Sequence, residues 1–122
     1  MVKTIFCDID GTILKHHGEN CLHKAMKTRP TVLPNVIETF DRWKYKEYRI
    51  ILVTGRPESM RNVTEKQLEE TGIIYDMLIM GLPHGPRVVI NDTKPSMSKT
   101  AIGMTVERNA GFDTEHLLED LK

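Results

Sequence analysis

The chain has 122 residues, and its 17 lysines and arginines equal its 17 aspartates and glutamates, so the formal net charge at pH 7 is zero. This balance gives no electrostatic reason to expect nucleic-acid wrapping or anionic-membrane binding. The two cysteines make no disulfide framework, and no apolar run approaches the roughly 20 residues of a membrane span. We therefore expect one domain, residues 1–122, with a single core and a cytoplasmic location.

The first predicted element is a short strand that begins at Thr4 and leads into two carboxylates, Asp8 and Asp10, followed by Gly11 and Thr12. An apolar run of this length bounded by a glycine is typical of a buried strand. Residues two apart in a strand point to the same side, so both carboxylates leave the strand end together. The minor interpretation is a plain turn. Because adjacent carboxylates at a buried strand end are costly without a cation, we favour a functional site.

Residues 13–33 fit neither a helix nor a strand, and we expect an extended loop or small hairpin there, a flap after the first strand. The segment contains His16, His17, Cys21 and His23. A zinc site is one interpretation, but the irregular spacing and the lack of a C-x-x-C pair favour solvated loop residues.

The first helix is predicted over residues 34–47, where Pro34 suits the first helical position and apolar residues recur at helical spacing. Residues 48–53 form a second apolar strand that ends in Thr54-Gly55-Arg56-Pro57. A second helix follows over about residues 57–71, with Gly72 as its stop. Thr54 has two compatible interpretations, a cap for that helix and a polar group at a strand end.

Further strands are predicted over residues 75–80, 87–90 and 101–106, and a short helix from about Thr114 onward. Strands that alternate with helices imply a mostly parallel sheet covered on both faces. The expected fold class is therefore α/β, with a five-stranded sheet in three α/β/α layers.

Three polar clusters follow three separate apolar runs: Asp8 to Thr12, Thr54 to Arg56, and Asn91-Asp92. In an open parallel sheet, ligands bind outside the carboxyl ends of the strands, so the three clusters are expected to meet at one edge. Carboxylates with a hydroxyl and backbone amides suit Mg²⁺ and a phosphate.

Taken in order, these clusters resemble the motifs of small capless phosphatases of the haloacid dehalogenase superfamily, with its Rossmann-like core. The resemblance rests on the DxDGT signature at Asp8 to Thr12, on Thr54 with its following Gly-Arg, and on Asp92 at a strand end. It implies that Asp8 is the nucleophile that forms an aspartyl-phosphate. It also implies that Asp10 is the general acid and base.

The same resemblance implies a Mg²⁺ cofactor held by the side chains of Asp8 and Asp92 and by the backbone carbonyl of Asp10. Thr54 would donate its hydroxyl to a phosphate oxygen, with Gly55 among the nearby backbone amides.

Two residues depart from the family's pattern. Leu82 stands where small relatives carry a lysine that pairs with the phosphate, and we expect another cation to replace it: first Lys94, then Arg87, then Arg56. Arg87 would begin a parallel strand and so lie at its wrong end. Asn91 stands where many relatives have a second aspartate, which lowers the charge of the site by one.

Only about twenty residues separate the first motif from the first helix, too few for a cap domain. An open site implies closure by another subunit, hence a homo-oligomer, or by a large substrate. His16, His17 and the turn that holds His84 are candidate substrate contacts, although His84 also fits a simple turn residue.

We expect a small sugar phosphate or related metabolite as the substrate, because the net charge is zero. The same resemblance also covers phosphatases that remove 3′-phosphates from polynucleotides, and a local basic patch is compatible with zero net charge. A non-catalytic Mg²⁺-binding module is a further alternative, which Leu82 and Asn91 favour and the intact Asp8-Asp10 pair opposes.

Overall fold

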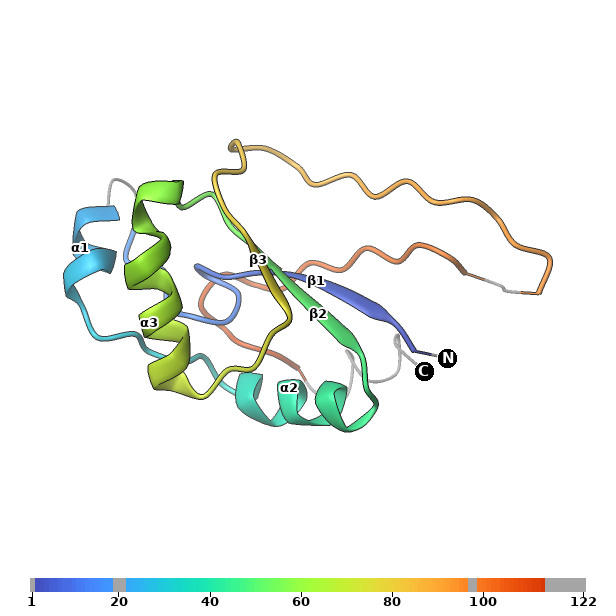
Figure 1. Ribbon diagram of the computed structural model, residues 1–122, viewed down its shortest axis with the longest axis horizontal. Helices are drawn as coiled ribbons and strands as arrows, with labels where there is room; N and C mark the ends of the chain where they lie inside the picture. The colour runs from blue at the N-terminus through green and yellow to red at the C-terminus, as the bar shows by residue number, and fades with distance from the viewer. Residues whose placement is uncertain (1, 19–21, 97–98, 114–122) are drawn as a thin grey trace.

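The computed structural model describes residues 2–18, 22–96 and 99–113. Figure 1 shows a body of strands and helices from which two long legs project, residues 83–96 and 99–107, and we call these two legs the arm. The elements in chain order are β1 (Thr4–Asp8), α1 (Leu22–Lys27), α2 (Val36–Tyr45), β2 (Arg49–Val53), a 3₁₀ turn (Glu58–Met60), α3 (Arg61–Thr71) and β3 (Met77–Ile79). No helix among these ranges is long and apolar enough to cross a membrane.

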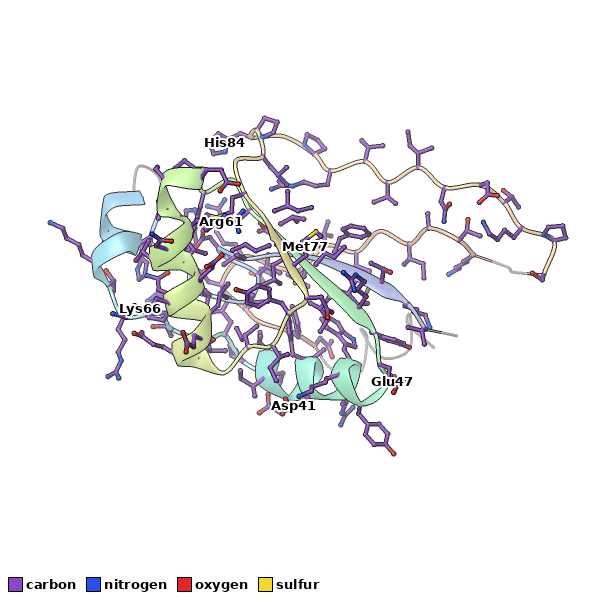
Figure 2. All side chains as sticks on the ribbon, in the orientation of Figure 1. Asp41, Glu47, Arg61, Lys66, Met77 and His84 are labelled. Atoms are coloured by element: carbon purple, nitrogen blue, oxygen red, sulfur yellow. The ribbon has the colours of Figure 1, made fainter. Side chains whose placement is uncertain are left out.

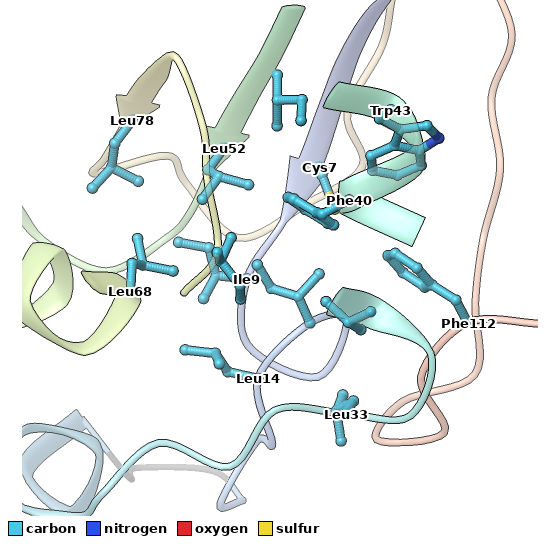
Figure 3. Packing of buried hydrophobic residues seen from close by; sticks show 14 of the residues in the cluster. Cys7, Ile9, Leu14, Leu33, Phe40, Trp43, Leu52, Leu68, Leu78 and Phe112 are labelled. Carbon is cyan, nitrogen blue, oxygen red and sulfur yellow. The ribbon is translucent and has the colours of Figure 1, made fainter. Parts of the chain in front are cut away.

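The sheet has three parallel strands in the order β1-β2-β3. The register aligns Cys7 with Leu52 and Leu52 with Leu78, so these three side chains form one row on one face. Phe40 of α2 and Leu68 of α3 both pack toward this row (Figure 3). The connection from β1 to β2 through α2 and the connection from β2 to β3 through α3 run in the same direction along the sheet. Because such connections are right-handed, both helices lie on the same face.

The opposite face of the sheet is largely uncovered by the described residues. Its central row aligns Phe6, Ile51 and Met77, of which Phe6 is 57% exposed and Met77 46%. The expectation of helices on both faces is therefore not met within the described ranges, which form two layers. The helix expected from about Thr114 lies outside the described residues.

The expected strands at residues 87–90 and 101–106 are absent from the described part of the chain, which contains three strands and not five. Both segments lie in the arm, where Val88 is 78% and Ile90 91% exposed. One side-chain bond joins the two legs, from Asn91 Nδ2 to the carbonyl of Thr100 at 2.9 Å. Their composition favours strands, but a strand forms only where its backbone groups find a neighbouring ladder, and the legs project away from the sheet (Figure 1).

Residues 13–33 leave the first motif as a loop with a hairpin-like base. Leu14 forms an isolated antiparallel bridge with Val32, and both Ile13 and Leu14 are buried in the core. The extended path expected here is interrupted by α1, which lies beside α3 (Figure 1).

After the arm the chain returns to the body and packs against α2. Phe112 stacks on Phe40 with 6.4 Å between ring centroids and lies 5.9 Å from the ring of Trp43. Its backbone N–H donates to the carbonyl of Pro34 at 2.9 Å. This return brings residues 107–110 against the turn that follows β1.

Candidate active site

The DxDGT motif forms a tight turn at the carboxyl end of β1. Ile9 is fully buried between the two aspartates, and its carbonyl oxygen accepts the N–H groups of three following residues, Thr12, Ile13 and Leu14, at 2.9–3.1 Å. Gly11 has φ +86°, a left-handed conformation that glycine adopts without strain. The buried Ile9 anchors the turn, and both carboxylates lie at its surface-facing edge.

Asp8 is only partly compensated by its neighbours. Thr12 Oγ1 donates to Asp8 Oδ2 at 3.1 Å, and Arg87 Nη2 lies 3.9 Å from Asp8 Oδ1. Burial raises the pKa of Asp8 above its usual range, against the lowering effects of the Thr12 hydroxyl, the Ile9 backbone and Arg87, and the charge of Asp10 raises it slightly further. The ionised form of Asp8 therefore lacks a strong positive partner.

Asp10 has such a partner in Arg56. The guanidinium binds the carboxylate through two bonds, Nε to Oδ2 and Nη2 to Oδ1, each at 2.8 Å. Arg56 is only 4% exposed, and its Nη1 donates to Thr64 Oγ1 at 3.0 Å and to Gln67 Oε1 at 2.7 Å. The ion pair fixes the orientation of Asp10 from the interior of the protein.

Thr54 follows β2 at the same edge of the sheet and is 1% exposed. Its backbone N–H donates to the carbonyl of Ile79 at 2.9 Å, and its Oγ1 accepts the N–H of Arg56 at 3.1 Å. Among the described residues the hydroxyl donates no hydrogen bond, so its proton is available to a ligand. Gly55 lies beside the backbone of Leu82, whose carbonyl oxygen is 3.4 Å from the position a Cβ would take.

Two residues predicted for this cluster, Asp92 and Lys94, lie outside it. Both are on the arm, where they pair with each other and have side chains that are 68% and 49% exposed. The prediction assumed that a fourth strand brings Asp92 to the sheet edge, and that strand does not form. His84, also exposed, occupies the turn where the arm begins (Figure 2).

The structure does not support the expected order of the three cations proposed to replace the missing lysine. Arg56 was assigned to the phosphate, but Asp10 and two residues of α3 use its guanidinium. Arg87 was expected at the wrong end of a strand, yet it stands at the base of the arm, from which its side chain reaches Asp8. Arg87, and not Lys94, is the cation beside the first aspartate.

Sequence reasoning missed a contact from the far end of the described chain. Asn109 uses its side chain on both backbone groups of His16, accepting the N–H at 2.7 Å and donating to the carbonyl at 3.0 Å. Its backbone N–H donates to the carbonyl of Gly11 at 2.8 Å. Arg108 lies alongside, with its Cγ 3.1 Å from the position of a Gly11 Cβ. No local motif signals this contact, because the chain must return from the arm to make it.

The carboxylate oxygens of the first motif are donors of the kind that Mg²⁺ takes, but they do not by themselves form a complete metal site. No group of three or more His, Cys, Asp or Glu side chains that could hold a metal forms in residues 2–18, 22–96 and 99–113. Arg56 offsets Asp10, and Asp8 has only Arg87, so a phosphate dianion beside Asp8 needs a further cation. Mg²⁺ takes oxygen ligands and is often held by one or two carboxylates, waters and the substrate phosphate itself.

Cys7 lies directly before the first aspartate, and its buried position agrees with its interpretation as a core thiol. Burial, with a smaller effect of the Asp8 charge, raises the pKa of Cys7 to about 12. The thiol is therefore protonated at neutral pH and takes no part in nucleophilic chemistry.

Comparison with known proteins gives one family. The family model described as the polynucleotide kinase PNKP phosphatase domain, of the haloacid dehalogenase superfamily, matches residues 2–87. No curated protein sequence matches the chain.

Two solved structures of a Pnkp1/Rnl/Hen1 complex, one described as an RNA repair complex, contain a similar chain. The first is 29% identical over 65% of this chain, and the second 26% identical over 71%, each with a TM-score of 0.57. This chain covers only 25% and 31% of those proteins. A protein from Vibrio cholerae is 18% identical over 78% of this chain and 85% of its own, with a TM-score of 0.52, which indicates a similar fold alone.

Proposed function

Because the chain belongs to the haloacid dehalogenase superfamily, in the family of the polynucleotide kinase PNKP phosphatase domain, we propose that it is a Mg²⁺-dependent phosphomonoesterase with an aspartyl-phosphate intermediate. One observation carries the proposal: the two carboxylates of the first motif have different surroundings. Asp10 is held by a buried guanidinium, whereas the cation beside Asp8 is an exposed arginine 3.9 Å away. Two like groups in different environments suit two different roles.

Asp8 acts as the nucleophile through Oδ1, since Oδ2 accepts the hydroxyl of Thr12. The new P–O bond forms as the bond to the ester oxygen breaks. Asp10 donates a proton to that leaving oxygen, so it enters this step protonated, with one of its two bonds to Arg56 released. Asp10 then removes a proton from the water that cleaves the aspartyl-phosphate. Thr54 donates its free hydroxyl proton to a phosphate oxygen, and Arg87 offsets negative charge near Asp8.

Mg²⁺ would be held by the Asp8 carboxylate and the Asp10 carbonyl, and bound there it would offset the repulsion between phosphate and nucleophile. The assignment of Asp92 as a third ligand stays a prediction. It requires the arm to fold back toward β1, and the exposed apolar side chains of Val88 and Ile90 support such a rearrangement, since they gain by burial.

Two substrate classes compete. The zero net charge favours a small sugar phosphate or related metabolite. The family match favours a 3′-phosphorylated polynucleotide end, and an exposed Arg108 beside Gly11 adds a positive side chain near the motif. His16, His17 and His84 are proposed substrate contacts in either case.

The test is hydrolysis by the purified chain of p-nitrophenyl phosphate, sugar phosphates, nucleotides and 3′-phosphorylated oligonucleotides, with Mg²⁺ or with EDTA. We expect Mg²⁺-dependent turnover that EDTA abolishes and that Asp8→Asn removes without unfolding the protein. Asp92→Asn tests the third ligand. A rise of about tenfold in the Mg²⁺ concentration needed for half-maximal rate means that the arm folds back to the site, and an unchanged concentration means that Asp92 is not a ligand.

The panel distinguishes the alternatives. Turnover that is retained in Asp8→Asn contradicts the nucleophile assignment. A folded wild-type chain that binds Mg²⁺ but hydrolyses no member of the panel is a binding module with this fold. The substrate with the highest kcat/KM decides between the two proposed classes.

A further inference from the structure

We propose that Gln67 is a positioning residue for Asp10, acting through Arg56, and that it ties the orientation of this carboxylate to helix α1 of the 13–33 segment. The inference rests on the proposed function, because it concerns the general acid of that reaction. It follows from a continuous run of buried hydrogen bonds that starts at Asp10 and ends on the backbone of α1.

Gln67 lies on α3 and is 6% exposed. Its Oε1 accepts a bond from Arg56 Nη1 at 2.7 Å, on the side of the guanidinium opposite the bonds to Asp10. Its Nε2 donates to the carbonyl of Ala25 at 2.6 Å and more weakly to that of Thr28 at 3.4 Å. One amide therefore contacts the guanidinium and α1 at once.

A side-chain amide satisfies both neighbours, because it carries an acceptor and a donor. Arg56 presents an N–H donor and requires an acceptor, while Ala25 presents a carbonyl oxygen and requires a donor. The last carbonyl groups of a helix have no partner within it, and Ala25 is in the last turn of α1. Gln67 thus caps that helix end while it holds the guanidinium.

Thr64 provides an internal comparison. Its hydroxyl accepts a bond from the same Nη1 of Arg56 at 3.0 Å and is fully buried, but among the described side chains it makes no bond to α1. Loss of Thr64 Oγ1 removes one acceptor from the guanidinium. Loss of the Gln67 amide removes an acceptor and also disconnects α1. The difference between the two variants isolates the link to α1.

Orientation of a general acid matters most when the leaving group is a poor one. An alkyl oxide must be protonated as it departs, whereas p-nitrophenolate departs without that help. A displaced Asp10 therefore slows hydrolysis of an alkyl phosphate more than hydrolysis of p-nitrophenyl phosphate. The kcat/KM for the alkyl phosphate divided by the kcat/KM for p-nitrophenyl phosphate therefore reports the position of Asp10. This ratio is insensitive to the fraction of folded protein.

The experiment measures this ratio, using glycerol 3-phosphate as the alkyl ester, for Gln67→Met, Gln67→Glu and Thr64→Val, with Lys66→Ala as the exposed control on the same helix (Figure 2). We expect Gln67→Met to lower the ratio about tenfold or more, Thr64→Val to lower it less, and Lys66→Ala to leave it unchanged. Gln67→Glu keeps the acceptor for Arg56 and loses the donor to Ala25, so it tests the link to α1 directly. It also serves as the folded variant if Gln67→Met does not fold.

Amide hydrogen exchange of α1 is measured in the same proteins, because it needs no turnover. Faster exchange in Gln67→Met and Gln67→Glu than in Lys66→Ala supports the link, and equal exchange overturns it. With an active wild type, an unchanged ratio in Gln67→Met overturns the role in positioning Asp10. If the wild type hydrolyses neither ester, the proposed function fails, and the exchange data still decide the link.

Discussion

The three candidate cations differ in burial, and burial decides how much each ion pair contributes to stability and whether the cation can meet a ligand. Arg56 and Asp10 form a largely buried pair, with side chains 3% and 24% exposed, and removal of one partner from such a pair typically costs about 3–5 kcal/mol. Lys94 and Asp92 are 49% and 68% exposed, and a surface pair of this kind contributes about 1 kcal/mol or less. Arg87, at 44%, donates to the carbonyl of Gly85 at 3.3 Å and lies 3.9 Å from Asp8, and among the described residues it forms no closer ion pair.

These differences predict how alanine substitutions affect catalysis. Arg87→Ala should lower kcat/KM about tenfold, near 1.4 kcal/mol, because it removes the positive charge beside Asp8. Lys94→Ala should stay within about twofold of wild type, since its charge is already used by Asp92 on the arm. Steady-state kinetics with p-nitrophenyl phosphate check both, and a larger loss in Lys94→Ala would mean that the arm folds back over the site.

At the level of elements, the segment after the arm is held against the start of α2 by a close backbone approach. Gly111 has φ +79°, and a Cβ there would lie 2.3 Å from the carbonyl oxygen of Pro34 and 2.7 Å from its nitrogen. The Asn35 side chain also donates to the carbonyl of Phe112 at 2.9 Å. Only glycine allows this contact, which places Phe112 on the aromatic cluster of α2.

Gly111→Ala should therefore destabilise the protein by about 3 kcal/mol, the sum of a left-handed alanine and a clash with backbone. Gly72→Ala is the matched control, because Gly72 also has φ +79° but has nothing within 4 Å of its Cβ position. It should cost only about 1 kcal/mol. Urea denaturation measures both, and equal losses would show that the contact with Pro34 contributes nothing.

The features that could be predicted from the sequence depend on local interactions, and those that could not depend on contacts between residues far apart in the chain. The strands that end at Asp8 and Val53 and the helices before and after β2 could be predicted, because apolar spacing and Gly72 are local signals. The ion pair of Asp10 with Arg56 joins residues 46 apart, and the hydrogen bond between the His16 backbone and the Asn109 side chain joins residues 93 apart. Such contacts depend on the path of the chain, which also decided that residues 87–90 form no strand.

For the whole molecule, apolar surface is distributed unevenly. One sheet face is buried under α2 and α3, while the opposite face exposes Phe6 and Met77, and the arm exposes Val88 and Ile90. Exposed apolar side chains grouped in this way are typical of surfaces that associate. The expectation of a homo-oligomer stays a prediction, and the uncovered face and the arm are where it is best tested.

Ile90→Asp should therefore lower the weight-average mass of the protein at high concentration, measured by sedimentation equilibrium. It should change the free energy of unfolding by about 0.5 kcal/mol or less, since Ile90 is 91% exposed. Leu52→Ala is the contrasting variant, because Leu52 is fully buried and its truncation should cost about 2–5 kcal/mol. If the wild type is monomeric at all concentrations, the exposed surface does not drive association.

The bond between Asn109 and His16 has a consequence for how much of the chain the site requires. Synthesis proceeds from the N-terminus, so the residues of the first motif emerge first, yet their loop acquires its last hydrogen bonds only after residue 109 has been made. A fragment limited to the family match, residues 2–87, would carry both aspartates, Arg56 and Gln67 but not Asn109. The smallest complete form of this site is therefore longer than the region by which its family is recognised.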